Sequence, residues 1–126
     1  LGYPKDSFIE RFLITYKGSC PAKLQEALGM DSKTSDEYSF STTGYSLNTF
    51  LISTYCFLKT DNYKDCVNKA IFLGGDADTQ GAVVGSLAGV YYGYETIPRM
   101  WCNTLIKRGY IIDLAKQLCV KASIIN

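Results

Sequence analysis

The sequence contains no histidine, and this absence removes several common kinds of enzyme chemistry. Histidine is the usual general acid or base near neutral pH and the usual partner of a nucleophilic serine or cysteine. Its absence also excludes zinc sites that depend on imidazole ligands. Any catalysis by this chain must therefore rely on carboxylates, hydroxyl groups or bound metal ions.

The cysteines form no recognisable cluster. The five of them are scattered without a C-x-x-C pair, and their odd number does not fit a disulfide framework. We therefore expect a reducing compartment such as the cytoplasm, and no thiolate metal site. Cys56, Cys102 and Cys119 fall in apolar helical patterns, where we expect them to be small core residues.

Strong net charge and a membrane-spanning run are also missing. The 13 basic and 12 acidic side chains nearly balance, so we expect neither nucleic acid nor an anionic membrane as a partner. The glycine- and alanine-rich stretch at residues 79–94 spans about 16 residues, fewer than the roughly 20 that cross a bilayer. The sequence does not start with a basic region followed by an apolar run, so we expect no signal peptide. Specificity is therefore expected to come from a local site.

Apolar residues recur at spacings of three and four along most of the chain, which indicates helices, and strand-type alternation is sustained nowhere. The expected helices cover residues 5–16, 21–28, 45–58, 62–72, from about 79 to 93, 97–107 and 110–120. The polar segment 31–43 is expected to be a loop. The sequence thus predicts an all-α fold, with residues 1–126 forming one packed helical domain.

Two of these helices have a defined apolar face. In the helix over 45–58 the residues expected to face inward are Leu47, Phe50, Leu51, Thr54 and Tyr55. In the helix over 62–72 they are Tyr63, Cys66, Val67, Ala70 and Ile71. We expect the two helices to pair as a helical hairpin.

Four glycines follow one another at intervals of four in the helix that ends near residue 93. They are Gly81, Gly85, Gly89 and Gly93. Each interior glycine gives up about 1 kcal/mol of helix propensity relative to alanine. Their presence therefore predicts that another helix approaches this face closely and so positions the turn before it.

Two aspartates flank a single residue in a glycine-preceded turn. Asp76 and Asp78 can direct their carboxylates to one point, and Thr79 can add a hydroxyl oxygen beside them. Hard cations such as Mg²⁺ and Mn²⁺ prefer oxygen ligands of this kind. A D-x-D-T string is also common, and either aspartate can instead cap the following helix. Taken alone, the residues leave both interpretations open.

The run over residues 70–93, AIFLGGDADTQGAVVGSLAGVYYG, resembles the C-terminal signature of the ADP-ribosylglycohydrolase family. The similarity includes the Gly44-Tyr45 pair and covers residues 44–115, whereas residues 1–43 show no motif that aligns with the family. The resemblance favours metal ligands over helix caps at the D-x-D-T string. It also implies the C-terminal part of the all-α fold of that family.

The resemblance further implies a role for individual residues. A dinuclear magnesium or manganese centre would be ligated by Asp76, Asp78 and Thr79. Gly74 and Gly75 would let the backbone come close to the ligand. Tyr45 resembles an aromatic residue that lines the adenosine end of the pocket, although ordinary core packing of Tyr45 is the alternative.

The activity implied by the resemblance is metal-dependent hydrolysis of an ADP-ribosyl glycosidic bond, which removes ADP-ribose from a modified acceptor. The family's relatives are longer, and their N-terminal part supplies further metal ligands and an acidic residue that have no counterpart here. We therefore expect a partial domain that needs a complementary N-terminal chain or self-association. A non-catalytic module that binds ADP-ribose or metal is the alternative, and the intact Asp76 and Asp78 argue against a purely structural role.

Overall fold

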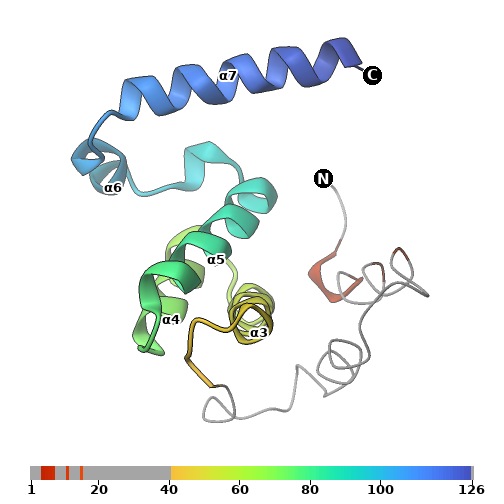
Figure 1. Ribbon diagram of the computed structural model, residues 1–126, viewed down its shortest axis with the longest axis vertical. Coiled ribbons are helices and arrows are strands. Elements are labelled where there is room, and N and C mark those ends of the chain that lie inside the picture. Colours follow the sequence, from red (N-terminus) through yellow and green to blue (C-terminus); the bar gives the residue numbers. More distant parts are fainter. Residues whose placement is uncertain (1–3, 8–10, 12–14, 16–40, 126) are drawn as a thin grey trace. The chain divides into compact units, whose positions relative to one another are not determined.

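The computed structural model describes residues 4–7, 11, 15 and 41–125. The regular elements of this part of the chain are all helical, so the predicted all-α class is confirmed (Figure 1). In chain order they are η1 (Lys5–Ser7), α3 (Ser46–Leu58), α4 (Tyr63–Phe72), α5 (Ala77–Tyr92), η2 (Tyr94–Thr96), α6 (Arg99–Thr104) and α7 (Arg108–Ile125).

The chain divides into two compact units, Leu1–Thr96 and Ile97–Asn126. The first unit holds α3, α4 and α5, which pack against one another in all three pairings. The second holds α6 and α7. Formation of one domain by the whole chain stays a prediction.

Several of the predicted elements fall where the chain is not described. They are most of the helix over 5–16, the whole helix over 21–28, and residues 31–40 of the predicted loop. Within the first of these, Lys5–Ser7 form η1, and Arg11 and Thr15 are helical. Residues 41–43 are not helical, in agreement with the described part of the predicted loop.

α3 has neighbours on two sides, because both α4 and α5 pack against it. Thr54 and Tyr55 are buried as predicted, but Leu47, Phe50 and Leu51 are only half-buried. The buried set is Thr49, Ile52, Ser53, Thr54, Tyr55, Cys56 and Phe57. The predicted face was therefore partly wrong, because a helix enclosed from two directions also buries small polar side chains.

α4 begins at a reciprocal cap. The side chain of Asn62 accepts a hydrogen bond from the backbone N–H of Asp65 at 2.9 Å, and its amide donates to the Asp65 carboxylate at 2.7 Å. Three of the five residues predicted to face inward are buried: Cys66, Val67 and Ala70. The other two, Tyr63 and Ile71, instead cover glycines of α5.

The glycine face of α5 is where α4 approaches it. A Cβ atom at Gly81 would lie 3.4 Å from Cγ1 of Ile71, and one at Gly85 would lie 3.3 Å from the hydroxyl oxygen of Tyr63. A Cβ at Gly89 would lie 3.8 Å from the same tyrosine ring. The predicted close approach of another helix is confirmed, and the partner is α4.

α5 also has a second row of buried residues, and it ends at a glycine. Gln80, Val84 and Ala88 are buried at intervals of four, in the row beside the glycines. Gly93 has φ of 90° at the C-cap and meets nothing within 4 Å, so it ends the helix rather than extending the packed face.

The helices of the second unit differ from their predicted bounds. α6 is shorter than the helix predicted over 97–107, because Leu105 is extended and Lys107 has φ of 61°. α7 extends beyond both ends of the helix predicted over 110–120. None of the described helices is long and apolar enough to span a membrane.

The cysteines differ in burial. Cys56 is fully buried, as predicted, and Cys102 is partly buried. Cys119 is exposed, so its predicted core position was wrong. Within the unit Ile97–Asn126, the described side chains of α7 are exposed apart from that of Ile112, so Cys119 lies on a helix without a buried face there.

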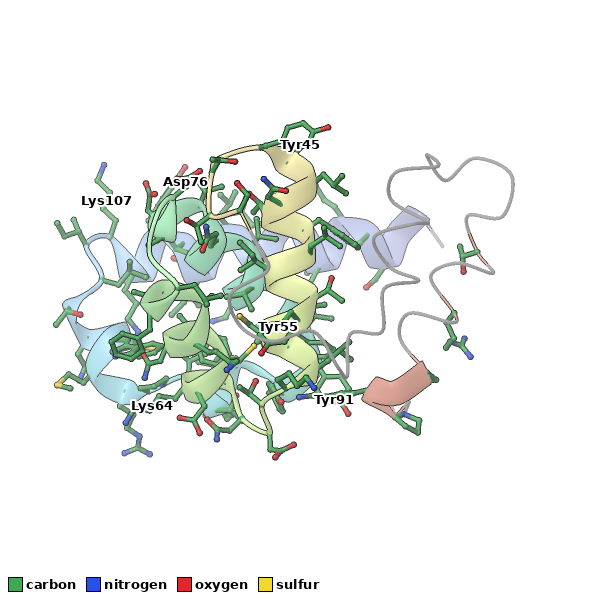
Figure 2. The ribbon with its side chains drawn as sticks, turned by 90° about the horizontal axis from the view of Figure 1, so that it is seen from below. Tyr45, Tyr55, Lys64, Asp76, Tyr91 and Lys107 are labelled. Atoms are coloured by element: carbon green, nitrogen blue, oxygen red, sulfur yellow. The ribbon has the colours of Figure 1, made fainter. Side chains whose placement is uncertain are left out.

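An aromatic cluster closes the end of α3 that lies opposite residue 45 (Figure 2). The rings of Phe57, Tyr91 and Tyr92 meet edge to face, with centroids 5.1 to 6.3 Å apart. The hydroxyl of Tyr92 donates to the carbonyl oxygen of Thr60 at 2.9 Å, and the ammonium group of Lys5 donates to that hydroxyl.

This environment predicts an unusual titration of Tyr92. Desolvation raises the pKa of Tyr92 to about 12, and the charges of Cys66, Asp61 and Tyr91 act in the same direction. Because the folded pKa is raised, the stability contributed by the neutral phenol is present below pH 10 and is lost as the pH rises from about 10 through 12. Tyrosinate absorbance of the parent minus that of Tyr92→Phe should show a transition near pH 12. A difference transition near pH 10 would contradict this environment.

Candidate functional site

Two consecutive glycines turn the chain between α4 and α5. Gly74 has φ of 75° and Gly75 has φ of 66°, in the left-handed region that L side chains rarely adopt. A Cβ atom at Gly75 would collide with the carbonyl oxygen and side chain of Thr42. The turn therefore requires glycine at position 75 and lies directly against residues 41–44.

Asp76 is the N-cap residue of α5, and neighbours hold it on several sides. Its backbone N–H donates to the carbonyl oxygen of Thr42 at 2.9 Å, and its Oδ1 accepts from the hydroxyl of Thr79 at 2.9 Å. Its Oδ2 lies where a Cβ atom on Gly44 would be only 2.5 Å away. The side chain makes no capping hydrogen bond to the backbone, so the helix-cap alternative fails for this residue.

Asp78 lies in the first turn of α5 and is exposed. Hydrogen bonding to the side chain of Asp76, and then to the backbone N–H groups of Thr79 and of Asp78 itself, holds the pKa of Asp78 below its usual value. These backbone contacts are the ones expected of an aspartate that caps the helix, so the helix-cap alternative stays open for Asp78, whose carboxyl also adjoins that of Asp76. The structure thus brings together the three predicted ligand side chains, whose role in metal binding stays a prediction.

This donor set suits part of a site for a hard divalent cation. Two adjacent carboxylates and a hydroxyl are oxygen donors of the kind that Mg²⁺ and Mn²⁺ prefer. Across the described ranges, however, no three or more histidine, cysteine, aspartate or glutamate residues gather as a metal site would require. Two octahedral ions need about a dozen ligand positions. Asp76, Asp78 and Thr79 can therefore fill only a part of such a centre.

A buried glutamine ties the turn to the preceding loop. Gln80 is completely buried, and its Nε2 donates to the carbonyl oxygen of Thr42 at 3.3 Å. That carbonyl thus accepts from both Gln80 and Asp76. Sequence analysis missed both partners. Thr42 carries no distinguishing signal in its polar segment, whereas a glutamine that precedes Val84 and Ala88 in a row with intervals of four was a detectable sign of an inward polar group.

Tyr45 lies at the same end of α3 as Asp76 (Figure 2). It is the N-cap residue of α3 and is 57% exposed, so ordinary core packing is the wrong alternative for it. Beside Gly74 the space is open, since a Cβ there would meet nothing within 4 Å. The ligand-binding roles of Tyr45, Gly74 and Gly75 stay predictions.

Comparison with known proteins gives a consistent result. Residues 3–123 match the family described as ADP-ribosylglycohydrolase, a range that extends into the first 43 residues. The chain is 38% identical over 76 residues to ADP-ribosylarginine hydrolase Tri1 of Serratia proteamaculans, which covers 60% of this chain and 21% of the relative. It is 36% identical over 70 residues to ADP-ribosyl-[dinitrogen reductase] glycohydrolase of Rhodospirillum rubrum. That match covers 56% of this chain and 24% of the relative. The matched segments thus span less than a quarter of these curated relatives. No solved structure matches.

Proposed function

Because this chain belongs to the ADP-ribosylglycohydrolase family, we propose that it supplies part of an active site that hydrolyses an ADP-ribosyl glycosidic bond. The observation that carries the proposal is the meeting of the Asp76 and Asp78 carboxyls, with the Thr79 hydroxyl, at the N-terminal end of α5. The two relatives are named for ADP-ribosylarginine and for ADP-ribosylated dinitrogen reductase. By analogy, the proposed substrate is an ADP-ribosylated acceptor and the product is ADP-ribose.

The proposed cofactor is magnesium or manganese, in a dinuclear centre. When bound, such ions supply Lewis acidity and lower the pKa of a water ligand. Asp78 would present an exposed carboxylate from the first turn of α5. Asp76 would meet the cation with little reorganisation, because Thr42 and Thr79 already fix its backbone and its Oδ1.

The substrate would lie beside Asp76 and Asp78, near the N-terminal end of α3, a place that we call the metal end. Tyr45 offers an exposed aromatic ring there, on which an adenine base can stack. Gly74 and Gly75 leave the backbone of the turn bare, so that a ligand can approach it closely. These residues would bind and orient ADP-ribose, while the remaining oxygen ligands and the acidic group near the scissile bond would come from a complementary N-terminal segment.

Metal binding gives a direct test of the proposed ligands. In calorimetry with Mn²⁺, Asp78→Asn should weaken binding at least about tenfold, since a neutral amide deprives a hard cation of its charge partner. Asp113→Asn is the matched control, because Asp113 is an exposed aspartate on α7 and should leave binding unchanged. Equal Mn²⁺ affinities for the parent and Asp78→Asn would refute the assignment.

One observation favours a second candidate function, a module that binds ADP-ribose or metal without catalysis. Among the residues that the structure describes, the acidic groups near Asp76 are too few for a complete centre. Such a module would bind ADP-ribose in the presence of Mg²⁺ and release none from a modified acceptor, even when a complementary N-terminal segment is present.

A further inference from the structure

The C-terminal end of α3 presents backbone carbonyls that need hydrogen-bond donors, as every helix end does. The backbone N–H of Lys59 donates to the carbonyl oxygen of Tyr55 at 3.0 Å. The hydroxyl of Thr60 donates to the carbonyl oxygen of Cys56 at 2.7 Å. The next carbonyl, that of Phe57, accepts from the side-chain nitrogen of Lys5 at 2.7 Å.

The ammonium group of Lys5 meets three acceptors at this place. Besides the Phe57 carbonyl, it donates to the carbonyl oxygen of Thr60 and to the hydroxyl oxygen of Tyr92. A lysine ammonium has three N–H donors and accepts no hydrogen bond. The three acceptors around it therefore match its three donors. The negative end of the α3 dipole adds to the attraction for a cation.

Three aromatic rings surround the same nitrogen. The ammonium lies 4.6 Å from the ring centroid of Phe57, 4.7 Å from that of Tyr92 and 5.5 Å from that of Tyr91. Rings within about 6 Å of a cation attract it through their negative faces, as those of Phe57 and Tyr91 do here, whereas the nitrogen meets Tyr92 at its hydroxyl. The rings come from α3 and α5, so the site is formed between two helices that pack against each other.

We propose that the end of α3, with Tyr91 and Tyr92 of α5, is a binding site selective for a primary ammonium ion, and that its ligand is the Lys5 side chain. Three converging acceptors fit three ammonium donors. They do not fit a planar guanidinium fork, and they would be left unsatisfied by a quaternary ammonium ion, which has no N–H. The site holds residues 4–7 against α3 and α5. The contacted residues, Phe57 and Tyr92, lie 52 and 87 positions after Lys5 in the sequence.

This site is separate from the metal end of the molecule. Tyr91 lies at one end of α3, whereas Tyr45 and Asp76 lie at the other (Figure 2). Loss of the ammonium should therefore act on stability and leave Mn²⁺ binding at Asp76 and Asp78 unchanged. The proposal does not depend on the proposed function.

Chemical rescue tests the selectivity. In the 126-residue chain, Lys5→Ala should raise the unfolding equilibrium constant at least about tenfold, since charge-assisted hydrogen bonds are lost. Addition of n-butylammonium chloride should reverse this loss saturably in Lys5→Ala. Tetramethylammonium chloride at the same concentration should not. Lys64→Ala removes an exposed lysine of α4 and should change neither stability nor the response to either salt.

Three results would overturn the proposal. They are a Lys5→Ala chain as stable as the parent, a chain that n-butylammonium fails to rescue, and equal rescue by the two salts. If Lys5→Ala fails to fold, NMR of ¹⁵N-lysine-labelled parent decides. The parent should show one slowly exchanging side-chain ammonium signal that is absent from Lys5→Arg and retained in Lys64→Ala. A parent spectrum without such a signal would equally refute the site.

Discussion

Replacement of Gly85 by leucine should lower the free energy of unfolding by about 1 to 3 kcal/mol, the range typical of an overpacked core. A Cβ atom at this position would already lie 3.3 Å from the hydroxyl oxygen of Tyr63 and 3.7 Å from Cγ2 of Val67. The further carbons of leucine would crowd these two side chains unless α4 and α5 move apart. The gain in helix propensity, at most about 1 kcal/mol, offsets only part of this cost.

The same substitution in another helix provides the control. Gly109 lies in α7, and a Cβ atom there would meet nothing within 4 Å. Gly109→Leu should therefore leave stability unchanged or raise it slightly, because only the propensity gain remains. Urea unfolding of the two variants separates the effects. Equal stability of the parent and Gly85→Leu would show that the α4–α5 contact is not tight.

The helices of the first unit could be predicted because their signals are local. The Asn62 cap and the glycine spacing of α5 are readable within one or two helical turns. The burial of α3 was less predictable, because it depends on two neighbours whose positions no short pattern specifies. The limits of α6 likewise depend on backbone conformation at Leu105 and Lys107, two residue types that carry no stop signal.

The candidate site shows the same division between local and distant information. Asp76, Asp78 and Thr79 lie within one turn of the chain, so their spacing alone predicts that their oxygens come together. The partner of Gln80 is Thr42, which lies 38 residues away, and the partner of Lys5 is Phe57, which lies 52 residues away. Neither contact leaves a periodic trace in the sequence, because each depends on how α3 and α5 pack.

The purified chain on its own should release little or no ADP-ribose from an ADP-ribosylated protein. Asp76, Asp78 and Thr79 provide about three oxygen donors, whereas two octahedral ions need roughly a dozen. Water molecules alone cannot fix two ions at the spacing that orients a ribose. A displacement of reacting groups by about 1 Å can cost roughly a hundredfold in rate, so an incomplete centre should show activity near background.

Release of ADP-ribose from ADP-ribosylated arginine, by this chain combined with the N-terminal portion of the Serratia relative, tests the central claim most directly. With Mg²⁺ or Mn²⁺ present, the combined protein should hydrolyse the substrate. Asp78→Asn should lower the rate at least about a hundredfold, and Asp113→Asn should not change it. An Asp78→Asn protein as active as the parent, or hydrolysis by the parent that persists after chelation of the metal, would contradict the account.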